Sequence, residues 1–258
     1  MLQTNDGLRF RRNSSQKPPA AVSRAPAVAS AARGGTAAGT LGQYYKRLLE
    51  ALGPQGWWPA TTRLEVILGA ILTQNTTWNN AARALARLRS RGLLSLKRLR
   101  DIEEANLRSL IRPAGFFVQK ARAILGFVAW VDTVHAGSLD RMFRMRAEPL
   151  RTALLELKGV GPETADAILL YAGGKPFFVA DAYTRRILAR HGLVSESSTY
   201  DETQTFVHRN LERDAEVYNE FHALLVEVGK RYCRRSRMKC SACPLGAYLR
   251  PSGPCRVS

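Results

Sequence analysis

The stretch LLELKGVGPETADAILLYAGGKPFFVAD, Leu154–Asp181, decides the fold of this 258-residue chain. A short apolar segment runs into Gly159-Val160-Gly161, and Pro162 then opens a second segment whose apolar residues recur at helical spacing. Proline fits the first turn of a helix, because the N–H that it lacks would have no partner there. The two glycines permit a tight turn with positive φ and a close approach of another backbone. The stretch therefore predicts a helix, a glycine hairpin and a second helix.

The predicted hairpin is suited to contact with the DNA backbone. The N-terminal amides of its second helix point outward, where they and the helix dipole attract a phosphate oxygen. Contacts of this kind read the backbone and are blind to base sequence. We therefore expect Lys158, Gly159, Val160 and Gly161 to bind DNA.

The residues that follow the hairpin carry a family resemblance. The pair Gly173-Gly174 precedes an apolar run that ends at Asp181. The segment LKGVGPETADAILLYAGGKPFFVADAYTRRI resembles the helix–hairpin–helix plus Gly/Pro…Asp signature of the endonuclease III superfamily of DNA glycosylases, and the resemblance extends over roughly residues 43–255. It implies an enzyme of base excision repair whose partner is double-stranded DNA containing a damaged base.

Apolar residues elsewhere in the chain also recur at helical spacing, from Leu41 onward. One stripe keeps the i, i+3, i+4 pattern without a miss and predicts a helix with one buried face: Leu64, Ile67, Leu68, Ile71 and Leu72. Strand signals are confined to Phe177–Val179. The sequence predicts an all-α protein.

The family resemblance implies two helical lobes with the active site between them. One lobe is the continuous block 62–175, and the other combines residues 41–61 with residues 176–232. Residues 233–258 would form an iron–sulfur loop and a C-terminal tail. Residues 1–40 are rich in Ala, Ser, Pro, Gly and Arg and lack periodicity, which predicts a disordered basic tail. An organelle transit peptide has a similar composition.

The net charge of +18 is concentrated near the C-terminal end of the chain. Residues 230–258 contribute +8 and contain no acidic side chain, whereas the much longer segment 41–229 contributes +5. A basic patch of this density is expected where a protein binds a polyanion such as DNA. No apolar run is long enough to span a bilayer, so we expect no membrane partner.

The N-terminal residues have no apolar core before a cleavage site, so export is not expected. The expected location is the cytoplasm or nucleoid in a bacterium, and the nucleus or an organelle in a eukaryote. We expect a monomer.

Asp181 is the candidate catalytic residue. Cleaving the bond between a base and its sugar builds positive charge on the sugar. A carboxylate at the edge of a dry pocket can stabilise that charge and orient or deprotonate the attacking water. The local pattern alone favours a capping role for Asp181, at the start of a helix that begins at Ala182. The two roles are compatible, and the resemblance favours catalysis.

Glu163 determines which reaction is expected. In superfamily members that also cleave the strand, a lysine at the corresponding position forms a Schiff base with the sugar. A carboxylate cannot form an imine, so the resemblance implies a monofunctional enzyme that uses water and leaves an abasic site. Alternatively, Glu163 is only a first-turn acid favoured by the helix dipole.

Two other functions stay open at this point. The first is a bifunctional glycosylase and AP lyase of the endonuclease III type, acting on oxidised pyrimidines, with Lys158 or Lys230 as the nucleophile. The second is a non-catalytic DNA-binding module that keeps the hairpin and the cysteine loop.

The motifs Trp57–Pro59 and Gln74–Thr76, together with Glu163, look most like the 3-methyladenine glycosylase branch of the superfamily. That resemblance implies a base pocket walled by Trp58 and Trp78. N-methylated purines are cationic, and a cation gains from an aromatic face and a nearby carboxylate. On packing grounds alone, however, tryptophans at helix ends are more often core residues.

Two further residues receive roles from the resemblance. Chemistry on a base requires rotating it out of the stack, and Gln74 matches the position that fills the gap. Lys230 falls where the branch has a pocket lysine. The alternatives are a polar residue at a helix terminus for Gln74 and a simple DNA contact for Lys230.

All the cysteines of the chain are gathered in one segment. Its four thiols lie within 23 residues, in the pattern Cys233-x6-Cys240-x2-Cys243-x11-Cys255. Such clustering indicates a metal centre, and a disulfide pair is not expected without an export signal. Four cysteines also suit tetrahedral zinc, which is the alternative metal.

The start of this cysteine pattern resembles the [4Fe–4S] loop of endonuclease III. The last gap is longer than the usual one of the family, which sets Cys255 apart as the fourth ligand. Arg234, Arg235 and Arg237 lie within the loop, where they are expected to contact phosphates. The implied role of the cluster is structural and DNA-binding.

Overall fold

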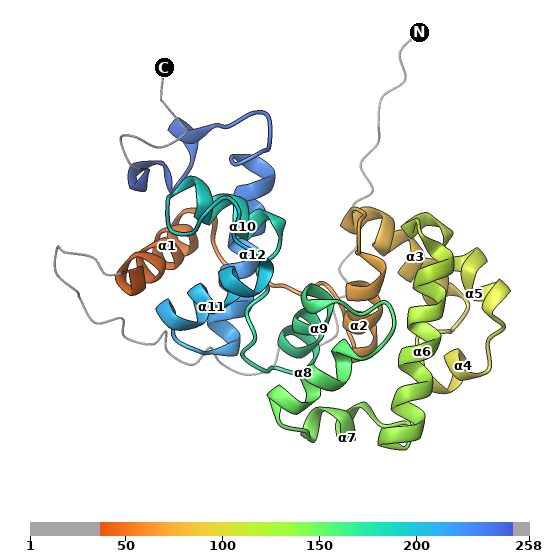
Figure 1. Ribbon diagram of the computed structural model, residues 1–258. Coiled ribbons are helices and arrows are strands. Elements are labelled where there is room, and N and C mark those ends of the chain that lie inside the picture. The colour runs from red at the N-terminus through yellow and green to blue at the C-terminus, as the bar shows by residue number, and fades with distance from the viewer. Residues whose placement is uncertain (1–36, 250–258) are drawn as a thin grey trace, which may run out of the picture. The chain divides into compact units, whose positions relative to one another are not determined.

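The computed structural model describes residues 37–249, which fold into helices joined by short loops (Figure 1). No strand occurs within this range, and its β pairing is limited to an isolated bridge between Cys233 and Met238. The predicted all-α class is confirmed. The strand candidate Phe177–Val179 is buried, irregular chain.

The helices follow one another in this order: α1 Ala37–Leu52, α2 Arg63–Leu72, α3 Trp78–Ser90, α4 Leu96–Arg100, α5 Glu104–Ile111, η1 Arg112–Ala114, α6 Phe117–His135, α7 Leu139–Arg144, α8 Ala147–Leu155, α9 Pro162–Ala167, η2 Ile168–Ala172, α10 Ala182–Arg190, α11 Tyr200–Asn210, α12 Ala215–Arg231, η3 Cys240–Ala242 and η4 Gly246–Tyr248. Helix α1 begins at Ala37, ahead of the predicted start at Leu41. The rest of the predicted tail, residues 1–36, lies outside the described residues. No helix within the described range is long and apolar enough to cross a bilayer.

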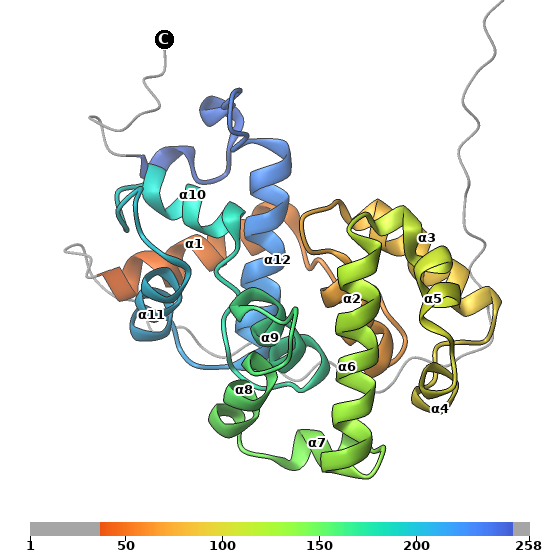
Figure 2. The same cartoon turned by 45° about the vertical axis from the view of Figure 1, so that its right-hand side comes forward.

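Segments from distant parts of the chain pack together (Figures 1 and 2). Helix α1 lies against α11 and α12, and α10 also packs on α12. Helices α2, α3, α5 and α6 contact one another in a second group. Helix α2 contacts α9 and η2, and η2 in turn contacts α12. The chain that follows the hairpin therefore touches both groups of helices, while the predicted boundaries of the two lobes stay a prediction.

Helix α2 lies in the core of its group of helices. The predicted apolar stripe is buried, but so is every other residue from Leu64 to Leu72, so the helix is buried on all sides and not on one face as predicted. The side chain of Thr62 caps the helix by accepting a hydrogen bond from the N–H of Glu65. The first turn is thereby fixed, and the helix ends next to the Thr73–Thr77 loop.

The predicted helix–hairpin–helix is formed by α8, the turn and α9. Pro162 is the first residue of α9, as expected. Gly159 has φ +88°, and a Cβ added there would lie 2.9 Å from the Cβ of Ala123 in α6. Gly161 has an extended φ of −95° and open space around it, so the predicted positive φ is confined to Gly159.

The second helix of the motif does not stay α-helical. From Ile168 to Ala172 it widens into a π-type turn, in which the N–H of Gly173 donates to the carbonyl of Ile168 at 3.1 Å. The π-type turn carries Tyr171. Single π turns inside helices are frequent at functional sites.

Candidate active site

Asp181 stands at the end of the buried run Phe177–Ala180 and at the start of α10. Its Oδ1 accepts a hydrogen bond of 2.8 Å from the N–H of Thr184, so the expected helix cap is present. The side chain keeps 13% of its surface exposed. The cap therefore leaves the carboxylate within reach of solvent and of a ligand.

Two residues that the sequence motifs did not point to lie beside Asp181. The His222 side chain on α12 is buried, and its Nε2 lies 3.6 Å from Oδ2 of Asp181. The Nδ1 of His222 is hydrogen-bonded to the hydroxyl of Tyr171. The one available signal was a polar residue directly after Phe221 in the apolar stripe of α12, which indicates a buried histidine but no partner.

Asp181 and Glu163 have opposite electrostatic surroundings. Burial raises the pKa of Asp181, but the nearby imidazole of His222 and the N–H of Thr184 outweigh it and leave the pKa below its ordinary value. Glu163 has exposed surface, yet partial desolvation and repulsion from Asp181 raise its pKa against the opposing pull of His222 and Arg185. The site thus contains one carboxyl that readily stays ionised and one that resists ionisation.

Aromatic rings from three segments form a cluster that reaches His222, the neighbour of Asp181. The rings of Trp58 and Trp78 meet edge to face, with centroids 5.3 Å apart at an interplanar angle of 88°. Trp58 also lies 4.9 Å from the ring of Tyr171. The ring of Trp57 lies 5.8 Å from that of His222. The structure therefore brings the two predicted wall residues together and connects them, through Tyr171, to Asp181.

The two wall tryptophans are also packed against the core, so the packing alternative holds as well. A Cβ added at Gly69 in α2 would lie 3.1 Å from the indole nitrogen of Trp58. Lys230 lies beside Trp57 at the edge of this aromatic cluster, and its role as a pocket lysine stays a prediction. Its ammonium is 5.5 Å from the centroid of the Trp57 ring and 2.9 Å from a carboxylate oxygen of Glu227, and the residue is exposed.

Gln74 is bound to the hairpin. Its side-chain nitrogen donates to the carbonyl of Gly159 and to the hydroxyl of Thr164, each at 2.8 Å. The predicted probing residue and the predicted phosphate-binding turn are therefore neighbours. In the turn, Lys158, Gly159 and Gly161 are exposed, whereas the Val160 side chain is 6% exposed and leaves only backbone atoms for DNA.

A buried lysine that the sequence analysis missed links two loops near this turn. Lys120 in α6 is 3% exposed, and its ammonium donates to the carbonyls of Leu72 at 2.9 Å and Ala114 at 2.7 Å. Burial lowers its pKa to about 8. The carbonyl of Leu72 precedes the Thr73–Thr77 loop, which contains Gln74. The carbonyl of Ala114 precedes Phe116, which is 63% exposed.

Three of the four cysteines line one small cavity together with Arg190 and His191: Cys233, Cys240 and Cys243. The guanidinium of Arg190 donates to the sulfur of Cys233 at 3.1 Å. Cys233 and Cys243 carry free thiols, whereas Cys240 is disulfide-bonded, so the expectation that no disulfide forms is wrong there; Cys255 lies outside the described residues. Within residues 37–249 no three ligating side chains are arranged around one ion. With Cys240 in a disulfide, only two free thiols, Cys233 and Cys243, face this cavity, so the described residues fit a thiolate-bound metal centre only when that disulfide is reduced.

The expected phosphate contacts of the cysteine loop are available. Arg234, Arg235 and Arg237 are exposed, and Arg190 donates to the carbonyls of Arg234 at 2.8 Å and Arg235 at 3.1 Å. Arg190 therefore ties the basic loop to α10, the helix that begins at Asp181.

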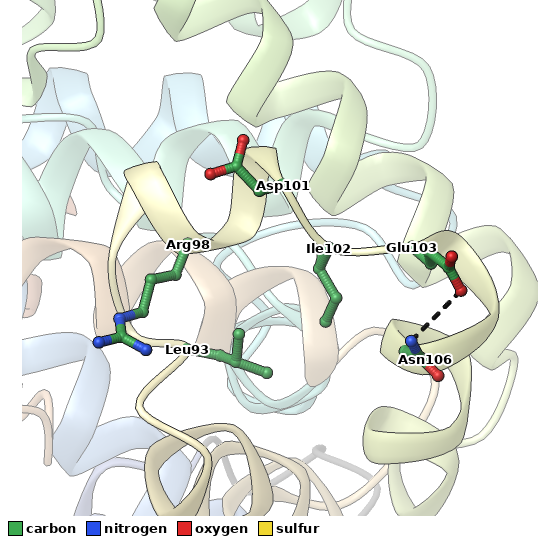
Figure 3. Close-up of a pocket in the computed structure, with 6 residues that line it drawn as sticks. All are labelled: Leu93, Arg98, Asp101, Ile102, Glu103 and Asn106. Carbon is green, nitrogen blue, oxygen red and sulfur yellow. Dashed lines mark hydrogen bonds between the residues drawn. The ribbon is translucent and has the colours of Figure 1, made fainter.

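A separate open pocket lies near α4 (Figure 3). Its lining comes from α4, the loops on either side and the start of α5: Leu93, Arg98, Asp101, Ile102, Glu103 and Asn106. The amide of Asn106 donates to Glu103 at 3.4 Å across its rim. None of the predicted site residues lines this pocket.

Comparison with known proteins gives a consistent assignment. Residues 68–213 match the profile of the HhH-GPD superfamily of base excision DNA repair proteins. A relative from Methanocaldococcus jannaschii, whose name is "Putative DNA repair glycosylase", is 43% identical over 206 residues, covering 79% of this chain and 93% of the relative.

Solved structures of similar proteins agree with this assignment. The 3-methyladenine DNA glycosylase of H. pylori, bound to 1,N6-ethenoadenine, is 30% identical with a TM-score of 0.65 over 76% of this chain and 97% of its own. A non-covalent endonuclease III–DNA complex matches in fold with a TM-score of 0.71 at 19% identity, over 83% of this chain and 95% of its own. With the hairpin, Asp181 and these relatives in view, the chain belongs to the HhH-GPD superfamily of base excision DNA repair proteins and is a DNA N-glycosylase.

Proposed function

We propose that this DNA glycosylase excises an alkylated purine, with 3-methyladenine as the leading substrate, by a monofunctional reaction that uses water. The observation that carries the proposal is the meeting of two carboxylates, Asp181 and Glu163, with a cluster of aromatic rings. The H. pylori relative that is bound to 1,N6-ethenoadenine supports a modified purine as the ligand.

Base recognition rests on the charge of the lesion. A purine methylated at a ring nitrogen is a cation, and a cation is attracted to the face of Trp58 or Trp78 and to a nearby carboxylate. Glu163 supplies that carboxylate from the first turn of α9. A neutral, undamaged purine gains nothing from these charges, so the site favours the damaged base.

Asp181 acts on the sugar. As the bond to the base lengthens, positive charge develops on the sugar, and an ionised carboxylate lowers the energy of that state. The depressed pKa of Asp181 keeps it ionised well into the acid range. It can also orient the attacking water or accept its proton.

The monofunctional mechanism rests on the residue at position 163. Glu163 has no amine to attack the sugar, and the ammonium of Lys230 is paired with Glu227. Lys158 lies in the hairpin, where a phosphate contact is the expected role. The predicted product is an abasic site in an intact strand.

We further propose that Cys233, Cys240, Cys243 and Cys255 hold a [4Fe–4S] cluster, with zinc as the alternative. When bound, the cluster crosslinks the loop and so presents Arg234, Arg235 and Arg237 to phosphates. The protein as purified without oxygen should be brown, with visible absorption and stoichiometric iron and sulfide. A colourless protein that contains one zinc per chain would contradict the cluster.

The partner is double-stranded DNA, for which we propose binding by a monomer. The exposed turn at Gly159 and the basic loop after Cys233 supply two separate sets of phosphate contacts. Each phosphate contact releases counterions, so the affinity should fall as the salt concentration rises, more steeply the more contacts the two sets make.

The test uses duplex DNA methylated with dimethyl sulfate and follows released bases by chromatography. The wild-type protein should release 3-methyladenine and leave alkali-labile sites, and borohydride should trap no covalent adduct. Asp181→Asn should slow release by about 10²–10³-fold while DNA binding persists. Asp140→Asn, on an aspartate that is 79% exposed in α7, is the matched control and should leave release unchanged.

Each alternative function has its own outcome. A trapped adduct would replace the monofunctional mechanism by the glycosylase and AP lyase mechanism. Binding to DNA without release of any base, from methylated or oxidised duplexes, would favour the non-catalytic module.

A further inference from the structure

His222 is the most deeply buried ionisable neighbour of Asp181 in α12, and its bonding is incomplete. The residue is 4% exposed, and within the described residues its Nε2 has no partner at hydrogen-bond distance. The Oδ2 of Asp181 lies 3.6 Å from that nitrogen. An unpaired buried nitrogen is costly, so a nitrogen aimed at a carboxylate calls for an explanation.

The hydrogen-bond partners decide where the proton of the ring sits. Asp181 uses Oδ1 to accept from Thr184, and an ionised carboxylate can only accept, so a bond to Oδ2 requires a hydrogen on Nε2. In the neutral ring Nδ1 is then an acceptor, and the hydroxyl of Tyr171 is its donor. Burial and the charges of Asp181 and Glu220 raise the pKa of Tyr171 well above its ordinary value, so the hydroxyl keeps its proton.

We propose that His222 is a positioning residue of the glycosylase reaction: Tyr171 orients its ring so that Nε2–H holds Oδ2 of Asp181 and keeps that carboxylate fixed and ionised. The inference rests on the proposed role of Asp181. The 3.6 Å separation closes to a hydrogen bond when the flipped nucleotide fills the site, because such bonds are often long in the free enzyme and tighten in the complex.

The charged and titratable groups around Asp181 determine how the loss of His222 would shift the pKa of Asp181. Glu163 on α9 opposes its ionisation, and His222 on α12 favours it. Tyr171 on η2 stays neutral, while Arg185 on α10 and Glu220 on α12 act through Glu163 and Tyr171.

Removing the donor at His222 therefore raises the pKa of Asp181. Because a carboxyl with a lowered pKa loses its charge only at strongly acid pH, the loss of activity on acidification should begin at a higher pH without His222.

The first test needs no substrate. The chain contains only four histidines, so ¹⁵N-histidine labelling gives a resolvable NMR spectrum, and the His222→Gln spectrum assigns the missing signals. We expect His222 to be the Nε2–H tautomer, with Nδ1 shifted as an acceptor, and Tyr171→Phe to weaken that Nδ1 shift. A predominant Nδ1–H tautomer would overturn the proposal whatever base the enzyme excises.

The second test measures the rate of 3-methyladenine release from methylated duplex over a range of pH under single-turnover conditions. His222→Leu should lower the rate about tenfold or more at mildly acid pH and recover part of it at higher pH. His222→Gln places an amide N–H near the position of Nε2–H and should restore most of the rate. Tyr171→Phe should shift the acid limb in the same direction as His222→Leu, by a smaller amount.

The outcomes separate the two proposals. If His222→Leu lowers the rate by the same factor at every pH, His222 only fills space and the proposal fails. If the wild-type protein releases no 3-methyladenine, the choice of substrate fails, and the tautomer measured by NMR still decides the role of His222. Thermal unfolding of each variant shows whether it is folded.

Discussion

At the scale of single residues, the site separates two carboxylates by their surroundings. Asp181 is held ionised by His222 and a backbone N–H, whereas Glu163 is desolvated and repelled by Asp181. Environments that separate the pKa values of two titratable groups suit the groups to different chemical roles. Asp181 is suited to the sugar, and Glu163 to the base.

Glu163→Gln should weaken binding of the methylated duplex in a pH-dependent way. Because the pKa of Glu163 is raised, its charge appears only as pH rises through that raised value, and attraction for a cationic base grows over the same range. The wild-type protein should therefore gain affinity with rising pH, and the variant should not, with a difference of about tenfold at neutral pH.

The measurement is half-saturation of single-turnover release at a series of pH values. Glu156→Gln, an exposed carboxylate on the same hairpin, is the matched control and should behave as the wild type. Equal pH dependence in wild type and Glu163→Gln would contradict the role of Glu163 in cation recognition.

The residue motifs predicted part of this site and could not predict the rest. Asp181 and Glu163 belong to a contiguous signature, so sequence alone singles them out. His222 and Tyr171 are separated by 51 residues and meet only through the packing of α12 on η2. No local pattern carries such a contact, and for the same reason the bonding of Gln74 to Gly159 was not foreseen.

At the scale of elements, a buried ammonium joins the two loops that flank α2 and α6. Lys120 binds the carbonyls of Leu72 and Ala114, which precede Gln74 and Phe116 respectively. Each carbonyl lies at a helix end, where among the described residues no backbone N–H donates to it. The ammonium of Lys120 supplies the missing donor to both. The position of the Gln74 loop therefore depends on α6.

Lys120→Met should change stability in a way that depends on pH. The pKa of Lys120 is lowered from 10.5 to about 8, so between these values the unfolded chain binds more protons than the native protein. The contribution of Lys120 to the free energy of unfolding therefore rises with pH across that window, by about 1–3 kcal/mol. Below about pH 8 Lys120 is protonated in both the native and the unfolded protein. The difference in the free energy of unfolding between the wild type and Lys120→Met is then constant.

Urea unfolding of the wild-type protein and of Lys120→Met at neutral pH and near pH 10 gives this difference directly. The exposed Lys97→Met is the control, and its difference from the wild type should not vary with pH. A difference for Lys120→Met that is the same at both pH values would show that the ammonium is not buried.

The elements themselves were largely predictable because helical periodicity is local. The stripe Leu64–Leu72 and the start of α9 at Pro162 follow from side-chain spacing and from proline chemistry. Two details depended on tertiary packing. Of the two hairpin glycines only Gly159 has positive φ, and it also has no room for a Cβ beside Ala123 of α6. The widening at Ile168–Ala172 leaves the 3.6-residue period of apolar positions without a visible break.

At the scale of the whole molecule, a buried polar network ties the hairpin helices to α11. Asp166 in α9 is fully buried and accepts from Arg151 of α8 at 2.6 and 3.0 Å. It also accepts from Tyr200 at 2.8 Å and Gln204 at 2.7 Å, both in α11. Gln204 in turn donates to the carbonyl of Phe178, three residues before Asp181.

Asp166→Asn should destabilise the protein strongly. The substitution removes the carboxylate that binds Arg151 at 2.6 and 3.0 Å and leaves this guanidinium, 21% exposed, only its longer contact of 3.7 Å with Asp201. Breaking a buried pair of this kind costs about 3–5 kcal/mol. Denaturant unfolding measures the loss, and Asp140→Asn, which breaks an exposed pair with Arg63, should give no measurable change. A small loss for Asp166→Asn would mean that the helices around the hairpin are held mainly by apolar contacts.

Large-scale properties were predictable where they follow from composition. The basic C-terminal segment indicated a polyanion, and the exposed arginines after Cys233 agree with it. The network of Asp166 was invisible in the sequence, because its four members lie in three helices and share no motif.

Because of the π-type turn at Ile168–Ala172, the geometry of the site depends on the number of residues in this helix. A π-type turn contains one residue more than the α-helical turn that it replaces. Deleting a single residue from it would rotate the two ends of the helix against each other by about 100° and take Tyr171 off the side that meets His222. In a relative whose helix has ordinary pitch here, the residue aligned with Tyr171 would therefore face another side, and a tyrosine at a different position would be needed to meet the histidine. Insertions and deletions in this helix are thus a place to look when the glycosylases of this family are sorted by active-site type.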